Sequence, residues 1–461
     1  MSRADPKPKA APAWTLVMSI AASSLSFIDG SVLNVALPAI RGDLHANGPQ
    51  IQWVVNAFTL PLAALILMGG ALGDHQGRRK WLVIGTALFA LASAACAVSP
   101  SLEVLLAGRA LQGIGAALLL PNSLALLNGV YEGEARGRAV GIWAAAGAIS
   151  AAIAPLIGGW LVDHAGWPSI FWINLPFAAA AILLALTKVE EVVQDKCRPL
   201  DWAGAVLATA ALGALTYALT LWSSEKSLST TSAVTLAAGV LCLLVFMLVE
   251  HRKGEDAMIP LGYFANRDFS ALNLMTFLLY GAFGGSLLLI PYVLISAGGY
   301  TPIEGGLSLL PLSIILAIGS PLMGKLAARI GPRWPLTVGP TVVGLGLLLG
   351  TRIAGGQAYW THVFPAIAVM SFGMALAVAP LTSAVLASVD ARHTGMVSGF
   401  NSALSRTGGL IATALLGAVL VAEGEALLQP FAVALVVAAI VAALGGVAAF
   451  IGLTGKGAPK P

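Results

Sequence analysis

The sequence consists mainly of long apolar runs, each close to the length that crosses a lipid bilayer, joined by short polar connections. A membrane-spanning helix needs roughly 20 consecutive apolar residues. Of the 461 residues, 58% are hydrophobic and 10% are charged, whereas soluble domains carry about 25% charged residues. We therefore expect an all-α integral membrane protein with fourteen spans, at 15–38, 51–72, 81–98, 102–129, 139–162, 167–187, 202–222, 231–250, 269–295, 303–327, 334–351, 361–388, 396–421 and 429–453.

The distribution of basic residues supports this topology, because Lys and Arg concentrate in the cytoplasmic loops of membrane proteins. Of the 25 Lys and Arg residues, 20 fall on one side of the predicted membrane, three on the other and two inside spans. The basic side holds both termini, and the other side holds Arg41, Lys226 and Arg352. We expect a multi-pass protein of the cell (inner) membrane with both termini in the cytoplasm. The basic residues are scattered in short clusters, so we expect no nucleic-acid partner.

Two similar loop segments indicate an internal repeat. Gly70–Arg79 and Gly324–Arg333 share the pattern G-x-L-[small]-x-x-x-G-x-R, and both follow a span on the basic side. Parallel repeats of this kind build some transporters from two matching halves. We expect a six-helix bundle at 1–188, two inserted transmembrane helices with their linkers at 189–268, and a second six-helix bundle at 269–461.

Three ionisable side chains lie at predicted membrane depth, where charge is costly and functional by default: Asp29, Arg109 and Arg406. Asp29 and Arg109 both lie roughly 10–15 Å below the same surface, at ~1.5 Å per residue, so they can be partners. Two roles fit the pair: a proton switch between a carboxylate and a movable cation, or a permanent ion pair that locks two helices. For Arg406, near mid-depth, two roles also fit: binding an anionic substrate group or stabilising a helix contact.

Polar and aromatic side chains inside the spans predict a mostly apolar cavity with a few polar groups, which suits lipophilic or amphipathic solutes. For each of them taken singly, an interhelical hydrogen bond is the alternative interpretation. The predicted substrate-binding residues are Asn34, Trp53, Asn56, Gln112, Asn122, Asn273, Tyr280, Asn401 and Arg406.

The sequence contains no nucleotide-binding P-loop pattern, so active transport would have to draw on an ion gradient. All six histidines fall in loops or at span ends, and we expect no metal site and no cofactor besides the proton gradient. No His/Asp/Ser constellation lies at membrane depth, so we expect no catalytic residues and no enzyme.

Several motifs resemble those of the major facilitator superfamily, and most closely its fourteen-span drug:proton antiporter branch, over essentially the whole chain. Gly70-x-Leu72-x-Asp74-x-x-Gly77-Arg78-Arg79 is similar to the family's loop motif between spans two and three. The segments Asp29–Pro38, Arg109–Gly113 and Phe171–Pro176 are similar to its first-, fourth- and sixth-span motifs. The resemblance implies proton coupling at Asp29 and Arg109, and a cytoplasmic charge latch at Asp74 and Arg78.

Glycines in the fifth span match the family's antiporter motif in part, although Ser150 and Ala154 stand where the family usually has glycine. The resemblance implies that this motif and the loop motif change conformation during transport. The expected conformational-switch residues are Gly70, Asp74, Gly77, Arg78, Pro155, Gly158 and Gly159.

The leading expectation is a monomeric, proton-coupled exporter of small lipophilic or amphipathic compounds that works by alternating access in the bilayer, as in multidrug efflux. One alternative is a dedicated exporter of a single endogenous metabolite or natural product. Another, from a different class, is a membrane sensor or scaffold that transports nothing.

Overall fold

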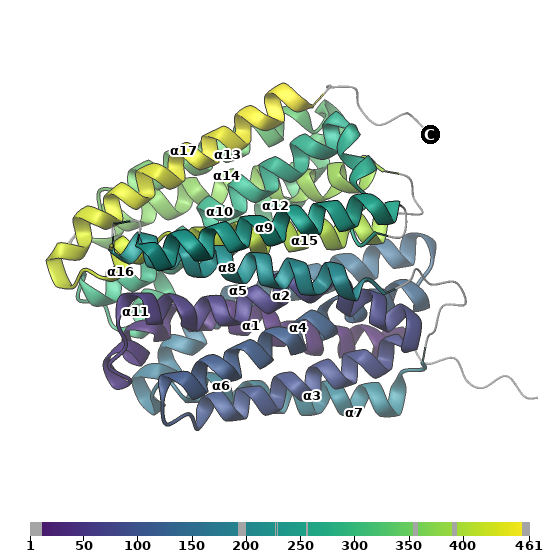
Figure 1. Ribbon diagram of the computed structural model, residues 1–461, viewed down its shortest axis with the longest axis horizontal. Coiled ribbons are helices and arrows are strands. Elements are labelled where there is room, and N and C mark those ends of the chain that lie inside the picture. The colour runs from purple at the N-terminus through teal and green to yellow at the C-terminus, as the bar shows by residue number, and fades with distance from the viewer. Residues whose placement is uncertain are drawn as a thin grey trace, which may run out of the picture.

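A computed structural model describes residues 12–191, 200–225, 227, 229–254, 257–353, 358–389 and 394–453, and within these ranges every regular element is a helix. Both ends of the described chain lie at the right of Figure 1. We call this the terminal end of the bundle and the opposite one the distal end. Some of the basic residues counted above lie outside the described residues: Arg3, Lys7, Lys9, Lys196, Arg198, Lys226, Arg392, Lys456 and Lys460.

The first group of helices runs from α1 to α7 and forms the lower half of Figure 1. The long helices alternate in direction between the two ends. Their bounds are α1 (Pro12–Asp43), α2 (Gly48–Gln76), α3 (Arg78–Ala97), α4 (Leu102–Val130), α5 (Gly133–Ala165), α6 (Ser169–Trp172) and α7 (Asn174–Lys188).

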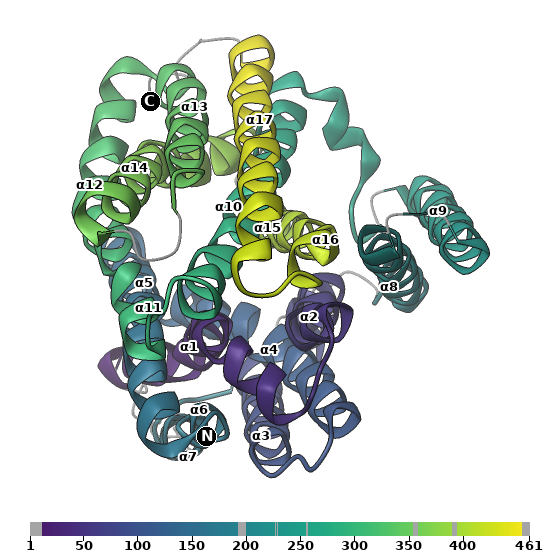
Figure 2. The same cartoon turned by 90° about the vertical axis from the view of Figure 1, so that its left-hand side faces the viewer.

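The next two helices, α8 (Trp202–Glu225) and α9 (Thr230–Lys253), form a hairpin at the side of the molecule, with α9 outermost (Figure 2). Only α8 touches the rest of the molecule extensively. The Tyr217 ring packs against Trp53 of α2, with 6.2 Å between centroids, and the Ser223 hydroxyl donates to the Ala414 carbonyl over 2.8 Å. The hairpin therefore lies against both halves through one helix.

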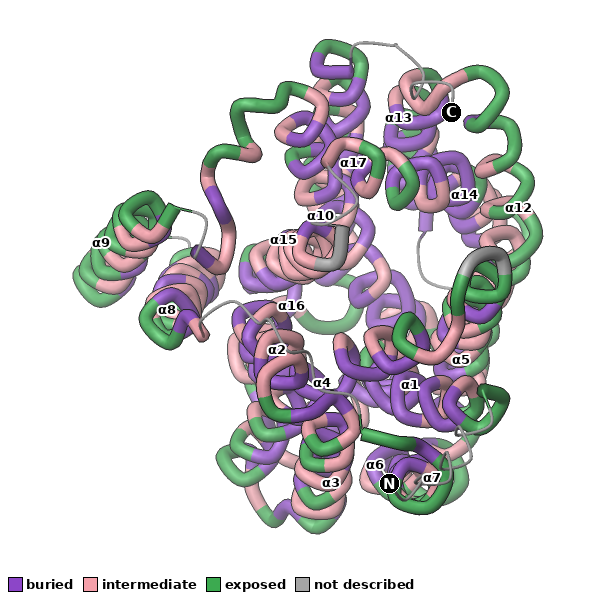
Figure 3. Tube along the Cα trace, turned by 90° about the vertical axis from the view of Figure 1, so that its right-hand side faces the viewer, coloured by how far each residue is buried: buried purple, intermediate pink, exposed green. Residues whose placement is uncertain are grey.

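The second half follows a short 3-10 turn, η2 (Leu261–Ala265). Its elements are α10 (Arg267–Ser296), α11 (Pro302–Ser308), α12 (Leu310–Ile330), α13 (Arg333–Gly350), η3 (Tyr359–Val363), α14 (Phe364–Ala387), α15 (Thr394–Ala414), α16 (Gly417–Leu420), η5 (Gly424–Leu427) and α17 (Leu428–Gly452). Buried positions concentrate on α1, α2, α4, α10 and α14, whereas α9 and α12 are largely exposed (Figure 3). Lipid would cover such outward apolar faces.

Within the described ranges, twelve helices are long and apolar enough to cross a bilayer. The two others that run alongside them are α13, which has 18 residues and begins at Arg333, and α15, which carries Asn401, Ser405 and Arg406. The all-helical architecture is therefore observed, and the fourteen-span arrangement stays a prediction. A polar helix packed between other helices needs less apolar character than one facing lipid, which accounts for α15.

Two of the predicted spans are interrupted near a proline. The span at 303–327 is divided into α11 and α12 at Leu309, two residues before Pro311, and the span at 167–187 is divided into α6 and α7 at Ile173, three residues before Pro176. Proline lacks the backbone N–H that a continuous helix needs, and it disfavours helical geometry in the preceding residue. The span at 396–421 likewise ends early, at Ala414, and continues as α16.

Candidate functional site

A buried ion pair joins α1 to α4 inside the first half. The Arg109 guanidinium donates to an Asp29 carboxylate oxygen over 2.5 Å, and each residue is 1% exposed. Asp29 is the only acidic residue described in the middle of a long helix, since the others lie near helix ends or in connections. Burying two charges is favourable only when they are paired and hydrogen-bonded, and here they are both.

Gln112, one helical turn after Arg109, contacts both charged groups. Its side-chain oxygen accepts from Arg109 over 2.8 Å, and its side-chain nitrogen donates to the other Asp29 oxygen over 3.2 Å. The same nitrogen donates to the Ser93 hydroxyl of α3 over 2.7 Å, and Asn174 of α7 donates to that hydroxyl over 3.3 Å. Four helices thus share one buried polar network.

Arg109 also has partners that do not depend on Asp29. Its Nε donates to the Val54 carbonyl of α2 over 3.1 Å. Its guanidinium carbon lies 4.6 Å from the centroid of the Phe58 ring and 5.9 Å from that of Phe171. Cations are attracted to aromatic faces at such distances. Arg109 would therefore keep several contacts if Asp29 became neutral.

The sequence analysis did not include Ser93, Asn174 or Val54 in this site. A serine in an apolar helix carries no signal of its role, and Val54 contributes only its backbone. Asn174 stands in the Phe171–Pro176 motif, and that motif was the available signal.

The polar residues predicted to bind substrate fall into different environments. Gln112 belongs to the buried network. Trp53 faces α8 through its contact with Tyr217, and Asn34 is partly buried, with no hydrogen bond among the described residues. Asn122 ties α4 to α2, since its side-chain nitrogen donates to the Gly69 carbonyl over 2.9 Å.

Asn273 and Asn401 join α10 to α15. The Asn401 amide nitrogen donates to the Asn273 side-chain oxygen over 3.2 Å and to the Thr276 hydroxyl over 2.8 Å. The Asn273 nitrogen is in turn committed to the Phe269 carbonyl over 2.8 Å. In this conformation the two asparagines serve helix–helix contact.

Three further members of the predicted set, like Asn34, make no hydrogen bond among the described residues: Asn56, Tyr280 and Arg406. Asn56 is fully buried, and both of its side-chain polar atoms lack a partner; Gln52, one turn earlier on α2, is in the same condition. Tyr280 and Arg406 are partly buried, and neither side chain makes a hydrogen bond or ion pair within the described part of the chain. The hydrogen-bonding groups of these side chains are therefore unused in this conformation.

The loop motif between α2 and α3 forms a charge cluster at the terminal end. Arg78 donates to Asp74 over 2.9 Å and to the Ala125 carbonyl over 2.9 Å. Gly77 adopts φ = +111°, a conformation that suits glycine, and a Cβ there would lie 2.5 Å from the Glu191 carboxyl carbon. Glu191 accepts from the backbone N–H groups of Arg79 and Lys80, at the favourable N-terminus of α3. Gly70 lies on α2, and a Cβ added to it would lie 3.5 Å from Pro121 of α4.

Two of the three fifth-span residues of the predicted switch, Pro155 and Gly159, lie at close backbone contacts near the distal end. A Cβ added to Gly159 would lie 2.4 Å from the Pro302 carbonyl oxygen, and one added to Gly306 would lie 2.2 Å from the Pro155 carbonyl oxygen. Gly158 packs instead on Val32 of α1. Ser150, at a position where the related motif has glycine, exchanges a hydrogen bond with Ser24 over 2.9 Å. Pro155 and Gly159 therefore sit where α5 of the first half meets α11 of the second.

The distal end is closed between the two halves. Besides the α5–α11 contact, a Cβ on Gly48 of α2 would lie 2.7 Å from the Leu420 carbonyl oxygen, and Asp163 accepts from the Ile303 backbone N–H over 3.1 Å. Toward the terminal end α12 is mostly exposed, with Leu312 and Ala327 as its buried residues. The structure thus represents a distally closed conformation.

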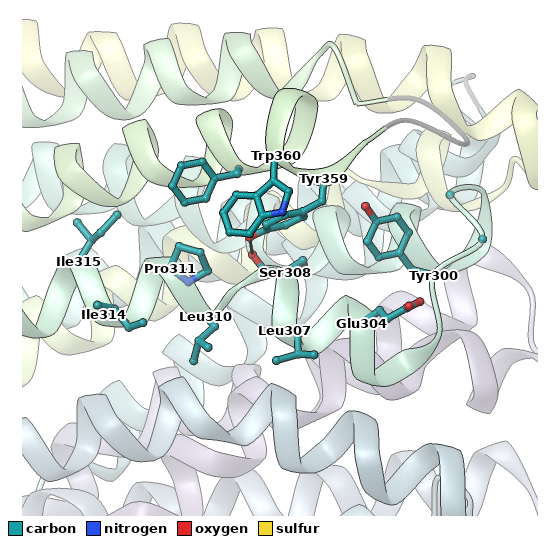
Figure 4. Close-up of a pocket in the computed structure, with 13 residues that line it drawn as sticks. Tyr300, Glu304, Leu307, Ser308, Leu310, Pro311, Ile314, Ile315, Tyr359 and Trp360 are labelled. Atoms are coloured by element: carbon teal, nitrogen blue, oxygen red, sulfur yellow. Dashed lines mark hydrogen bonds between the residues drawn. The ribbon is translucent and has the colours of Figure 1, made fainter.

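A large pocket of about 910 Å³ lies at the distal end of the second half, lined by α11, the start of α12 and η3 (Figure 4). Tyr359 and Trp360 form one wall, and Tyr300 and Glu304 lie near its mouth. Trp360 is 71% exposed, as expected for an aromatic side chain at a membrane–water boundary. None of the buried network residues lines this pocket, so we do not assign it to transport.

Comparison with known families identifies the architecture. Residues 20–303 match the family model of the Major Facilitator Superfamily, which is more than half of the chain. The chain belongs to the major facilitator superfamily. Members of this superfamily are transporters, so the chain is a transport protein and not an enzyme.

Curated members of the superfamily resemble the chain over most of its length. The Multidrug resistance protein Stp of Mycobacterium tuberculosis is 36% identical over 417 residues, which cover 90% of this chain and 77% of that protein. The Methylenomycin A resistance protein of Bacillus subtilis is 34% identical, covering 86% and 85% of the two chains. The Tetracenomycin C resistance and export protein of Streptomyces glaucescens is 31% identical, covering 88% and 75%.

A solved structure of a transporter has the same overall fold. The crystal structure of the peptide transporter POT in complex with sulfate aligns with a TM-score of 0.70, covering 95% of this chain and 94% of that one. At 14% identity this likeness concerns the fold alone.

Proposed function

We propose that this major facilitator is a proton-coupled exporter of small lipophilic or amphipathic compounds, with fourteen spans, a monomeric unit and both termini in the cytoplasm. The relatives named for drug resistance and export support efflux. The observation that carries proton coupling is the Asp29–Arg109–Gln112 network, which buries a titratable carboxylate beside a cation that has other partners.

The contacts of Arg109 suggest how protonation changes the network. When Asp29 gains a proton, its attraction for Arg109 falls, because a neutral carboxyl no longer pairs with a cation. Arg109 then keeps the Val54 carbonyl, the Phe58 ring and the Gln112 oxygen. Because Asp29 lies on α1 and Val54 on α2, protonation releases the arginine from α1 while its hydrogen bond to α2 remains.

The distal closure provides the second element of alternating access. In our proposal the distal end faces the cell exterior, and separating α5 from α11 gives Asp29 access to external protons. Reclosing that seam returns the proton to the cytoplasmic side while substrate is taken up there. One proton moving through 100 mV supplies ~2.3 kcal/mol, which raises a neutral solute roughly fiftyfold.

Reconstituted protein tests the proposal directly. Purified protein in liposomes containing a pH-sensitive dye would be given methylenomycin A or tetracenomycin C, the compounds that name two relatives. We expect either compound to start a proton flux through the wild-type protein, down the imposed pH gradient. Asp29→Asn should abolish this flux. Glu103→Gln is the matched control, since Glu103 is an exposed carboxylate at the distal start of α4.

Loss of folding must be separated from loss of coupling. Removing one partner of a buried ion pair costs about 3–5 kcal/mol, because the other charge is left uncompensated. The double variant Asp29→Asn/Arg109→Gln removes both charges and should recover thermal stability without recovering proton flux. Full gradient-driven flux in Asp29→Asn would show that Asp29 does not couple transport.

A further inference from the structure

Arg406 carries a positive charge in the middle of the bundle that no described group compensates. At membrane depth the described charged side chains are Asp29, Arg109 and Arg406, and the first two neutralise each other. An uncompensated charge at this depth is costly and requires water or a counter-ion. Arg406 is partly buried as a residue, and no described side chain supplies the counter-ion.

The position of Arg406 on α15 directs it toward the seam between the two halves. On α15, Asn401 and Gly408 contact α10 of the same half. A different face meets the first half: Gly399 lies against Leu67 of α2, and Ala403 packs on the cluster that contains Phe58 and Leu62. Arg406 follows Gly399 by seven residues and Ala403 by three, so it belongs to this second face.

Unpartnered amides lie on the facing surface of α2. Leu67, Asn56 and Gln52 are separated by eleven and four residues and therefore share one helix face. The α2 and α15 helices run antiparallel, with Leu67 beside Gly399 and Gly48 beside Leu420. At ~1.5 Å per residue this register places Asn56 roughly 6 Å distal to Arg406, within the span of one bound molecule.

Tyr280 adds a further donor at the same depth. Its neighbour Gly281 contacts Gly408 on α15, two residues after Arg406, so Tyr280 and Arg406 lie at a similar depth in the bundle. The Tyr280 hydroxyl has no partner among the described residues. Arginine offers five donors and no acceptor, and the tyrosine and amide groups can donate as well.

From this arrangement we infer that the exporter recognises organic anions, with Arg406 binding the carboxylate or sulfonate and Tyr280 and Asn56 completing its hydrogen bonds. This inference names the substrate class and rests on the proposed function for the transport step. A planar guanidinium binds such oxyanions through two parallel hydrogen bonds. The apolar surroundings accept the rest of an amphipathic molecule.

Three naphthalene probes with anionic, neutral and cationic head groups test the inference without any gradient. Naphthalene-2-sulfonate, naphthalene-2-sulfonamide and the 2-naphthyl trimethylammonium ion would be titrated calorimetrically into the protein in nanodiscs. We expect the sulfonate to bind roughly 10- to 100-fold more tightly than the sulfonamide, the range of a charge-assisted hydrogen bond. Arg406→Gln should remove this preference and leave sulfonamide affinity within about twofold.

Two further variants identify the cause of any change. Arg406→Lys retains the charge and should keep part of the preference, whereas Arg329→Gln, an exposed cation at the terminal end of α12, should change nothing. The inference is overturned if the wild type shows no sulfonate preference, if Arg406→Gln retains it, or if Arg406→Gln weakens sulfonate and sulfonamide equally. Anion-selective binding without gradient-driven proton flux would refute the proposed coupling and leave this inference standing.

Discussion

Arg41, at the distal end of α1, forms an ion pair with Glu423 of the other half, with 2.7 Å between the guanidinium nitrogen and the carboxylate oxygen. The same guanidinium donates to the Tyr292 hydroxyl over 2.7 Å and to the Leu420 carbonyl over 3.0 Å. One side chain of the first half thus holds three groups of the second. From the sequence, Arg41 was predicted only to lie on the side of the membrane that holds few basic residues.

Arg41→Gln should favour distal opening. Because Glu423 is 78% exposed, the ion pair itself is worth at most about 1 kcal/mol, and the two hydrogen bonds add about 1 kcal/mol. We expect roughly 5- to 30-fold faster labelling of a Gln52→Cys reporter by an impermeant maleimide, in a cysteine-free background. Arg352→Gln, an exposed distal arginine, is the control. Unchanged labelling in Arg41→Gln would show that this contact does not govern closure.

Two glutamines should respond in opposite directions to the same substitution. Gln52 is buried with neither polar atom partnered, so Gln52→Met removes an unsatisfied group and should stabilise the closed protein by about 1–3 kcal/mol. Gln112→Met removes the hydrogen bonds to Arg109, Asp29 and Ser93 and should destabilise it by a similar amount. Thermal unfolding in detergent measures both. A lower melting temperature for Gln52→Met would indicate a partner for that amide.

Gly306→Ala should prevent full distal closure. The added methyl would lie 2.2 Å from the Pro155 carbonyl oxygen, so α11 and α5 must separate. Gly141→Ala on α5 is the matched control, because a Cβ there meets nothing within 4 Å. We expect the distal maleimide reporter to react faster and efflux to fall about tenfold or more in Gly306→Ala. Normal efflux in that variant would mean that the seam need not close this tightly.

The ion pair between Asp201, directly before α8, and Lys253, at the end of α9, should lose its stabilising effect at acid pH. Burial raises the pKa of Asp201, but hydrogen bonds from Lys253 and the Gly204 backbone N–H outweigh it and hold the pKa below its ordinary value of 3.8. A lowered folded-state pKa gives stability that is present above the ordinary value and lost as pH falls through the folded-state value. Asp201→Asn should therefore lower the melting temperature at pH 7, and the difference should shrink below pH 3.8 and vanish once the pH has fallen through the lowered folded-state pKa.

The matched control for that comparison is Glu225→Gln, an exposed carboxylate at the other end of α8. It should behave as the wild type throughout the pH range. A difference between wild type and Asp201→Asn that persists at acid pH would assign the effect to packing and not to charge.

The span positions could be predicted from hydrophobicity because lipid imposes length and polarity on each helix. The predicted 102–129, for example, is observed as Leu102–Val130. The proximity of Asp29 and Arg109 followed from depth arithmetic alone, since two residues equally far from one surface can meet. Breaks before Pro311 and Pro176 were readable in principle and were missed, because the apolar runs continue through them.

Helix faces could not be predicted in the same way. Trp53 and Asn56 are three residues apart on α2, yet Trp53 meets the inserted α8 and Asn56 is buried without a partner. A membrane helix is apolar on all sides, so its sequence carries little record of which neighbour each side touches. Asn122 and Asn401 each bridge two helices, whereas Asn56 has no partner. Nothing in the sequence distinguishes these asparagines.

The contacts of α8 make the molecule laterally asymmetric. Tyr217 touches α2 of one half, and Ser223 holds α15 of the other, so this helix lies along the seam where those halves meet. No described helix covers the opposite seam between α5 and α12 (Figures 2 and 3). A solute dissolved in the bilayer would therefore meet a seam covered by α8 on one side of the protein and an uncovered seam on the other. Lateral recruitment from lipid, where it occurs, has a single direction of approach.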